Sequence, residues 1–281
     1  MRFAGVGQSP STRSEKRNHD TDAERIATRV RIRLVEDQGN GPEVVYVPGI
    51  DGTGQLLLGT QYRIERRFRL LRLRYVADDP VHDDTYERLA AGIVDVLDPR
   101  NVANAILIAE SFGGAVALQC ALDFPQRVRA LLIVNSFVWF PKRASLAMSR
   151  VTAPLVPRWL FALLRPRIAA ATFFGKLREP EALARFRAIQ GAYFDRGYRR
   201  RIAMIGKLDL RSRLGELRQP LAIFAAERDR VVPAAVCGAT MHELAPHAEL
   251  HTIANGGHVI LPLQSIDWPQ HIAELNARAD S

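Results

Sequence analysis

The sequence predicts an α/β fold: a mostly parallel central sheet with helices on both faces and a helical insertion. Three observations predict it. Short, continuous apolar runs alternate with helical patterns between residues 44 and 134. A long stretch that reads only as helix follows, and the alternation then resumes at residue 221. Apolar strands that are separated by helices are typical of a parallel sheet covered on both sides.

The first half of the chain supplies most of the expected sheet. Strands are expected at residues 28–35, 44–47, 68–75, 105–109 and 129–134, and helices at 55–65, 84–98 and 114–122. Along 28–35, Val30, Ile32 and Leu34 alternate with arginines, which favours a half-buried antiparallel strand at a sheet edge. The helix after Asp84 begins with a sequence that resembles a capping box.

The alternation breaks at Phe137 and resumes only after Gln219. Between them the pattern is helical with Pro and Gly punctuation, and its clearest helix is 181–193. The later elements are expected as strands at 221–226 and 248–253 and helices at 234–244 and 265–277. We therefore expect a disordered tail at 1–25, a core formed by 26–136 and 220–281, and a helical cap at 137–219 that roofs the sheet and lines a pocket.

The positive charge of the chain belongs to this insertion. Residues 137–219 hold 18 Lys and Arg against 5 Asp and Glu, a net charge of +13, whereas the whole chain carries +9. The insertion is therefore either a solvated, arginine-rich surface or a docking face for an anionic lipid, acyl-CoA or nucleic acid. Because no nucleic-acid-binding motif accompanies it, we expect no nucleic-acid partner. Peripheral contact with a membrane stays open.

Composition limits the compartment and the chemistry. Two cysteines, Cys120 and Cys237, both lie in apolar surroundings and read as buried thiols. No uncharged run approaches the ~20 residues of a membrane span, and the first residues lack a signal-peptide pattern. We expect a soluble cytoplasmic protein with neither cofactor nor metal. The sequence does not indicate an oligomeric state.

The stretch 104–114 carries the strongest chemical signal. An apolar run is followed by Glu110 and Ser111, then by Phe-Gly-Gly and a helix. A serine in a sharp turn between strand and helix is the context of a nucleophile elbow, which needs small residues two places before and after it. Ala109 and Gly113 occupy these places, so the usual first glycine is replaced by alanine. The alternative is an ordinary turn in which Ser111 caps the helix.

A second glycine-rich loop, 48–54, follows the expected strand 44–47. It lacks the Lys-Ser/Thr of a P-loop and the spacing of a dinucleotide fingerprint. Such a loop lets backbone amides point into a site. Asp51 in it is expected to make a turn-stabilising side-chain hydrogen bond. Glu110 is expected to be a solvated charge at the rim of the site, or else to tune a substrate pocket beside Ser111.

A serine nucleophile needs a base, usually histidine, and the histidine needs an orienting carboxylate. In a parallel sheet these groups should follow strands, because sites form beyond the carboxyl ends. Among the seven histidines only His258 stands in a glycine-rich turn directly after a strand. Asp229 follows the strand 221–226, with Glu227 as the neighbouring alternative.

With these residues the chain resembles the α/β-hydrolase superfamily over roughly residues 28–278. The order Ser111, Asp229, His258 is the superfamily's order of nucleophile, acid and base. The resemblance implies an α/β-hydrolase fold, a cap at the position of the insertion, and an oxyanion hole formed by the N–H groups of Ile50 and Phe112. Pro48 stands where many members have histidine. The loop 48–54 and the Ser-Phe-Gly-Gly sequence are also similar to plant phytyl ester synthase-type acyltransferases.

The function that the resemblance implies is a serine hydrolase that cleaves an ester or thioester of a small, apolar or anionic acyl compound. Ser111 would form an acyl-enzyme, His258 would transfer protons and Asp229 would orient His258. An acyltransferase with the same triad is the first alternative. A catalytically inactive protein that binds anionic surfaces through its basic cap is the second. Ser111 in place of Asp argues against haloalkane dehalogenase and epoxide hydrolase chemistry.

Overall fold

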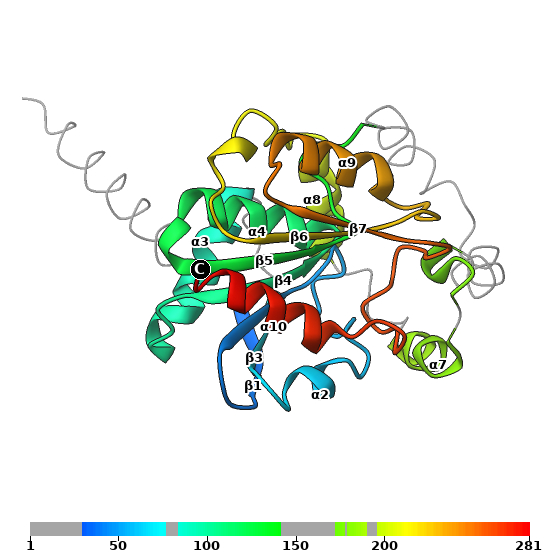
Figure 1. Cartoon of the computed structure of the whole chain (residues 1–281), viewed down its shortest axis with the longest axis horizontal. Coiled ribbons are helices and arrows are strands. Elements are labelled where there is room, and N and C mark those ends of the chain that lie inside the picture. Colours follow the sequence, from blue (N-terminus) through cyan, green and yellow to red (C-terminus); the bar gives the residue numbers. More distant parts are fainter. Residues whose placement is uncertain (1–29, 77–83, 142–171, 178, 190–195) are drawn as a thin grey trace, which may run out of the picture.

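The fold is a seven-stranded sheet with helices on both faces, as the sequence predicts (Figure 1). A computed structural model describes residues 30–76, 84–141, 172–177, 179–189 and 196–281. The strands are β1 Ile32–Gln38, β2 Glu43–Val47, β3 Arg69–Tyr75, β4 Ala105–Glu110, β5 Val128–Val134, β6 Leu221–Ala226 and β7 Glu249–Ile253. Their spatial order is β1-β3-β2-β4-β5-β6-β7, and among the strands of the described residues only β1 runs antiparallel to its neighbour. β1 is therefore the antiparallel edge strand that the alternating pattern predicts.

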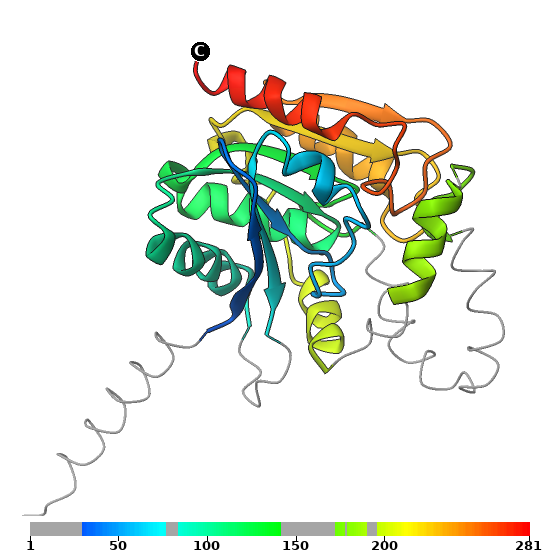
Figure 2. The same cartoon turned by 90° about the horizontal axis from the view of Figure 1, so that it is seen from below.

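The helices divide between the two faces of the sheet. They are α2 Gln61–Ile64, α3 Tyr86–Leu97, α4 Phe112–Asp123, α7 Pro180–Ile189, α8 Arg196–Ile205, α9 Ala234–Leu244 and α10 Trp268–Arg278. α3, α4 and α9 pack on one face, and α2 and α10 cover the other (Figures 1 and 2). Along each central strand alternate residues face opposite layers, so Leu107 faces α4 whereas Ile106 and Ile108 join the layer of α10.

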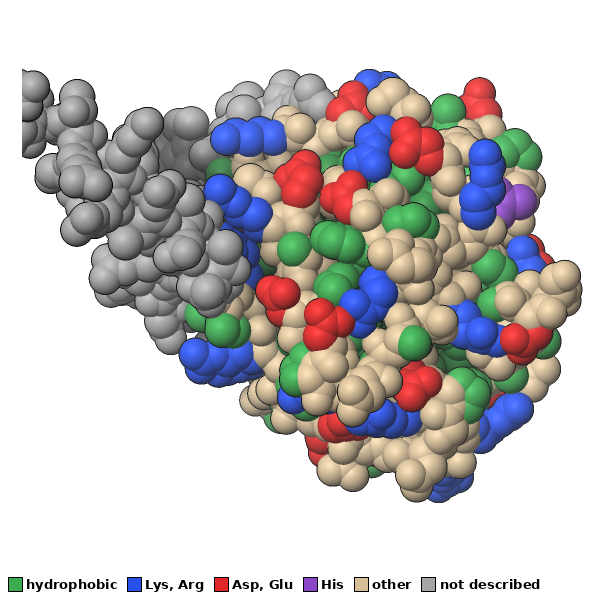
Figure 3. All heavy atoms as spheres, turned by 90° about the vertical axis from the view of Figure 1, so that its left-hand side faces the viewer, with side chains coloured by type: hydrophobic (Ala, Val, Ile, Leu, Met, Phe, Trp, Pro, Cys, Tyr) green, Lys and Arg blue, Asp and Glu red, His purple; other side chains and the backbone are tan. Residues whose placement is uncertain are grey.

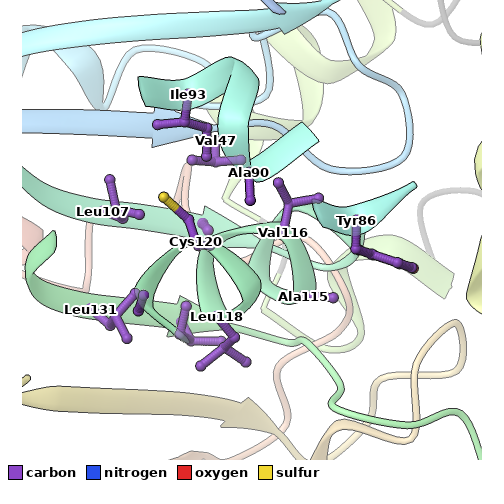
Figure 4. Close-up of a cluster of buried hydrophobic side chains, with 14 of the residues drawn as sticks. Val47, Tyr86, Ala90, Ile93, Leu107, Ala115, Val116, Leu118, Cys120 and Leu131 are labelled. Atoms are coloured by element: carbon purple, nitrogen blue, oxygen red, sulfur yellow. The ribbon is translucent and has the colours of Figure 1, made fainter. Parts of the chain in front are cut away.

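Helix α4 lies in the centre of the larger core. Every residue from Phe112 to Leu122 is buried, because the helix packs between the sheet and α3 (Figure 4). Its small residues allow this close packing, and Leu118 contacts the same layer as Leu107 and Leu131. Fully burying one such leucine stabilises the fold by roughly 1.5–3 kcal/mol. The helix that begins at Ser111 is thus one of the most firmly embedded elements.

Three predicted elements differ from the observed ones. The helix expected at 55–65 is only the single turn α2, because Leu58 (φ 48°) and Gly59 (φ 109°) adopt positive φ angles that interrupt a helix. The helix expected at 181–193 is observed as α7, and its last predicted residues lie outside the described ones. Strand β1 starts later than predicted, and Arg31, expected on the outer side, is buried beside Asp84, with 3.6 Å between Nε and Oδ1.

The insertion is tied to the core at both ends of its described part. Trp139 and Asp209 form an antiparallel bridge where the insertion leaves and rejoins the sheet, and Gly175 bridges to Gly256. α7 lies beyond the carboxyl ends of the parallel strands (Figure 1). The predicted tail and residues 142–171, which hold most of the apolar stretch expected to line the pocket, lie outside the described residues. The cap and its boundaries therefore stay predictions.

Two surface features bear on possible partners. Within the described ranges no helix is both long and apolar enough to cross a membrane. The side of the molecule at the left of Figure 1 carries Lys and Arg side chains interspersed with Asp and Glu (Figure 3). On the part of that face that is not covered in grey, neither sign of charge predominates.

Candidate functional site

Ser111 stands in a strained turn between β4 and α4. Its backbone has φ 53° and ψ −125°, a conformation that costs free energy for a residue with a Cβ. The close approach of neighbouring chain explains why glycines follow, since a Cβ on Gly113 would lie 2.3 Å from the Pro48 oxygen. Ser111 makes no side-chain cap bond to α4. The hydroxyl is therefore not used as a helix cap.

The neighbouring strand β5 holds this turn in place. The Ser111 N–H donates to the Val134 oxygen at 2.9 Å, and the Ser136 hydroxyl donates to the Ser111 oxygen at 2.7 Å. A Cβ on Gly114 would lie 2.3 Å from the Ser136 Oγ, so only glycine fits beside that hydroxyl. The strained conformation of Ser111 is thus fixed by hydrogen bonds of its main chain.

His258 and Asp229 lie side by side. The His258 Nδ1 and the Asp229 Oδ2 are 2.7 Å apart, and the Asp229 side chain is completely buried. The other Asp229 oxygen accepts the N–H groups of Val231 at 2.8 Å and Val232 at 2.9 Å. Glu227, the alternative acid, is exposed and accepts from the Asn255 N–H at 3.2 Å instead. The structure therefore brings Asp229, not Glu227, to His258.

Electrostatics favour a basic imidazole at this position. Burial alone would lower the pKa of His258, but the charge of Asp229 and its hydrogen bond outweigh burial, and Glu110 adds to them. The pKa of His258 is therefore raised above its ordinary value. With Nδ1 bonded to Asp229, Nε2 is the nitrogen left for proton exchange with another group.

A single asparagine fastens the turn that carries His258. The Asn135 side-chain amide donates to the oxygens of Gly257 at 3.0 Å and His258 at 2.8 Å. Its side-chain oxygen accepts the Ala226 N–H at 2.8 Å, at the end of the strand that precedes Asp229. Asn135 is buried and has a φ of 45°, a conformation that asparagine tolerates better than most residues. One side chain thus binds the segments of both the acid and the histidine.

The insertion covers the histidine turn from the other side. The Val259 N–H donates to the Phe173 oxygen at 2.6 Å, and the Lys176 N–H donates to the Asn255 oxygen at 2.9 Å. The Phe173 ring lies 6.3 Å from the His258 ring, centre to centre. Behind it is an apolar cluster that joins the insertion to the core: Leu56, Leu58, Phe174, Ala182, Phe186 and Val259.

The carbonyl oxygens of the loop 48–54 are nearly all held by hydrogen bonds. The Tyr75 hydroxyl donates to Pro48 and the Tyr75 N–H to Gly52, each at 2.9 Å. The Gly52 N–H closes a turn onto the Gly49 oxygen at 3.0 Å. The oxygens of Ile50 and Asp51 both accept from Arg201. The loop therefore has a fixed backbone conformation.

The two N–H groups expected to form an oxyanion hole stand out against this background. Neither the N–H of Ile50 nor that of Phe112 has a hydrogen-bond acceptor within the part of the chain that the structure describes. The first N–H groups of a helix, such as that of Phe112, have no partner within the helix, so they are free to bind an external group. That these two N–H groups form an oxyanion hole stays a prediction.

The structure corrects the interpretation of Glu110. It is buried rather than solvated, and the Tyr46 hydroxyl donates to its Oε1. Burial raises the pKa of Glu110 to about 7, with nearby Asp51 adding and Tyr46 opposing. Asp51 makes the predicted turn bonds, from the Thr53 N–H at 2.9 Å and hydroxyl at 2.5 Å, yet it too is buried, and burial raises its pKa. Two buried carboxyls with raised pKa values thus lie near each other, and one of them precedes Ser111 in the chain.

Sequence reasoning missed three residues that hold the site: Asn135, Ser136 and Arg201. The one available signal for Asn135 and Ser136 was a polar pair directly after a buried strand, at the same sheet edge as Ser111. Arg201 lies four residues after the buried Gly197 and four before the buried Ile205, where an apolar residue is expected. Among the described residues, no group of His, Cys, Asp and Glu is arranged to bind a metal ion.

A strained serine turn on a sheet of this order defines an enzyme of the α/β-hydrolase type, and comparisons with known proteins agree. The model of the alpha/beta hydrolase family matches residues 38–270, and the chain therefore belongs to that family. Among its relatives is a putative carbamate hydrolase RutD from Cronobacter sakazakii, 27% identical over 82% of this chain and 88% of that protein. The relative of the same name from Cronobacter turicensis is 25% identical, over 77% of this chain and 84% of that protein.

Solved structures give the same fold. A hydrolase from Pseudomonas aeruginosa is similar with a TM-score of 0.70 at 24% identity, over 89% of this chain and 93% of that one. An enol-lactonase from Burkholderia xenovorans gives 0.74 at 17% identity, over 88% and 96%. A thermophilic esterase from Thermogutta terrifontis gives 0.73 at 18% identity, over 89% and 94%. At these identities the likeness concerns the fold alone.

Proposed function

We propose that this chain is a serine hydrolase that cleaves a carboxylic ester or thioester through the triad Ser111, His258 and Asp229. The observation that carries the proposal is the buried His258–Asp229 pair beyond the carboxyl ends of β6 and β7, in the same parallel sheet as β4, whose own end holds Ser111. The hydrogen bonds of Asn135 and Ser136 support it, because they link the three segments that bear these residues.

The reaction follows from the roles of these groups. His258 Nε2 takes the proton of the Ser111 hydroxyl while Oγ attacks the carbonyl carbon, and Asp229 stabilises the imidazolium that forms. The N–H groups of Ile50 and Phe112 donate to the oxyanion of the tetrahedral intermediate. His258 then returns the proton to the leaving alcohol or thiol, and an acyl-enzyme remains. Water then attacks the acyl carbon while His258 takes one of its protons. His258 passes this proton to the Ser111 Oγ, which releases the acid and restores free Ser111.

The substrate is proposed to be a small acyl compound with an apolar part. The cluster of Leu56, Leu58, Phe174, Phe186 and Val259, with Phe173 against His258, supports an apolar surface beside the base. Esters, lactones and carbamates all offer an electrophilic carbonyl carbon with a leaving group. The names of the relatives and structural neighbours are therefore compatible with one mechanism, and carbamates belong in the test.

A fluorophosphonate probe tests the nucleophile. We expect the probe to label the chain, and Ser111→Ala to abolish both labelling and turnover while circular dichroism and the melting temperature stay near those of the parent. The same preparation is given aryl esters and thioesters of graded acyl length and a matching aryl carbamate, with and without an added alcohol. Labelling that persists in Ser111→Ala contradicts the assignment, and product that goes mainly to the alcohol indicates an acyltransferase.

A further inference from the structure

Arg201 is a buried arginine that the proposed reaction leaves without a role. It lies on α8, in the segment that the sequence assigned to the basic insertion, and only 3% of its surface is exposed. Burying an arginine costs free energy unless its N–H groups are bonded. Unlike Arg199 on the same helix, which is exposed, Arg201 points into the molecule. The burial of Arg201 is therefore not explained by a solvated, arginine-rich surface.

The guanidinium of Arg201 binds the loop that holds Ile50. Its Nε donates to the Ile50 oxygen at 2.7 Å, and its Nη2 donates to the Asp51 oxygen at 3.2 Å. The guanidinium carbon lies 5.3 Å from the centre of the Tyr75 ring, a cation–π contact. A Cβ on Gly52 would lie 2.9 Å from Nη2, so the loop uses a glycine with a φ of 74° where the arginine passes.

These bonds act on the middle of the loop. Tyr75 holds the loop at Pro48 and Gly52, but between these points the only side chain described as binding main-chain oxygens is that of Arg201. The Ile50 N–H belongs to the same peptide unit as the Gly49 oxygen, which accepts the Gly52 N–H at 3.0 Å, and Arg201 binds the next two peptide units inside that turn. Two successive peptide planes are joined at one Cα by only two torsions, so fixing the plane that follows restricts the directions open to the Ile50 N–H. Without Arg201 the Ile50 N–H would lose the constraint on its carboxyl side.

We propose that Arg201 is a positioning residue that sets the direction of the Ile50 N–H in the oxyanion hole. The insertion would thus contribute to transition-state stabilisation through the main chain of the core, without touching the reacting atoms. The proposal rests on the proposed function, because it presumes that Ile50 binds an oxyanion. An oxyanion-hole N–H binds the negative oxygen of the transition state more strongly than the neutral carbonyl of the bound substrate. If the Ile50 N–H is misdirected, kcat should therefore fall while KM stays nearly unchanged.

The test compares Arg201→Met and Arg201→Lys with Arg199→Met, which removes an exposed arginine from the same helix. Each variant is assayed for kcat and KM on a neutral ester and on an acidic ester, and for the inhibition constant of a trifluoromethyl ketone that forms a tetrahedral adduct with the serine. For Arg201→Met we expect kcat to fall about 10- to 100-fold, the inhibition constant to rise in parallel, and KM to change less than about threefold. Arg201→Lys keeps the positive charge but replaces the planar guanidinium, which can bond two oxygens, by a single ammonium group. Its kcat and inhibition constant should therefore lie between those of the parent and of Arg201→Met. Arg199→Met should match the parent.

Two results would overturn the proposal. If Arg201→Met lowers the melting temperature but leaves kcat and the inhibition constant unchanged in the folded fraction, the arginine only stabilises the fold. If KM rises for the acidic ester alone, Arg201 binds substrate directly. If Arg201→Met does not fold, Arg201→Lys decides between the same outcomes. Failure of the proposed function is seen separately, because Ser111→Ala would then keep its label whatever the Arg201 variants do.

Discussion

The histidine turn at 254–259 is fastened by one means, and the loop at 48–54 by the opposite one. We call the latter the oxyanion loop because it is proposed to bind an oxyanion. The histidine turn is bonded by the short Asn135 side chain of the core and by the main chain of residues 173–176. The oxyanion loop is bonded by long side chains, Tyr75 from β3 and Arg201 from α8. Both arrangements satisfy buried carbonyl oxygens, but only the second depends on a side chain of the insertion.

This difference indicates how freely each part can be adjusted. Asn135 has two side-chain torsions and is enclosed by β5 and β6, so the turn it holds should be rigid. An arginine has more torsions and loses more conformational entropy on burial, so a loop held by arginine is more easily displaced. Substrates or mutations that shift α8 should therefore alter the oxyanion loop before they alter the His258–Asp229 pair.

The largest effect is expected at Asp229, the acid that contacts the histidine turn. Asp229→Asn keeps an acceptor for the Val231 and Val232 N–H groups but presents an amide to His258, which favours the wrong tautomer. We expect kcat to fall by about 10⁴-fold, the loss seen in chymotrypsin-type triads. Glu227→Gln is the matched control and should stay within about twofold, as expected for a surface change. Equal losses in the two variants, measured by steady-state kinetics, would contradict the choice of acid.

Asn135→Gly breaks the same turn without touching a reacting group. Glycine tolerates the φ of 45° but leaves the Gly257 and His258 oxygens and the Ala226 N–H without a partner. We expect kcat to fall by about 10- to 100-fold and the free energy of unfolding by about 3 kcal/mol. Asn101→Gly makes the same change at a φ of 54° next to η1 (Asp98–Arg100), where Asn101 is exposed. If both variants retain full kcat in urea-titrated, folded samples, Asn135 does not position the turn.

On the oxyanion side, Tyr75→Phe removes the bond to the Pro48 oxygen. A buried carbonyl left unpaired costs about 1–3 kcal/mol, and kcat should fall only about three- to tenfold because Arg201 still holds the loop. Tyr86 provides the control, because its ring packs against Phe112 too but its hydroxyl is buried without a partner in the described structure. Tyr86→Phe should be neutral or stabilising in thermal unfolding. A larger loss of stability in Tyr86→Phe would refute this account.

Glu110 lies between the two regions and should produce the smallest change in rate. Its pKa of about 7 exceeds the ordinary 4.5, so the folded state keeps a proton that the unfolded chain releases. Stability is therefore fully retained below pH 4.5 and falls as the pH rises toward 7, by up to about 3 kcal/mol. Glu110→Gln should remove this part of the slope in urea titrations at pH 5, 6, 7 and 8. Parallel pH profiles for parent and variant would show that the carboxyl is not perturbed.

The sequence predicted what depends on local patterns. Each central strand is a short apolar run, and the turns of Ser111 and His258 carry glycines directly after such runs, so their positions could be inferred. The bonds that hold the site could not, because Asn135 meets partners 91 to 123 residues away. Arg201 was missed and Glu110 was misread for one reason: a charged residue is usually solvated, and only packing shows that these two are buried.

The long insertion also has a consequence for biosynthesis. Strand β5 ends at Val134, and its partner β6 does not begin until Leu221. At about 5–20 residues per second, a ribosome needs roughly 4 to 17 s to make the chain between them. During that time the edge of β5 that later pairs with β6 has no partner strand. An unpaired apolar edge is a template for aggregation. The nascent chain should therefore depend on chaperones most strongly in this interval, and shortening the insertion should reduce that dependence.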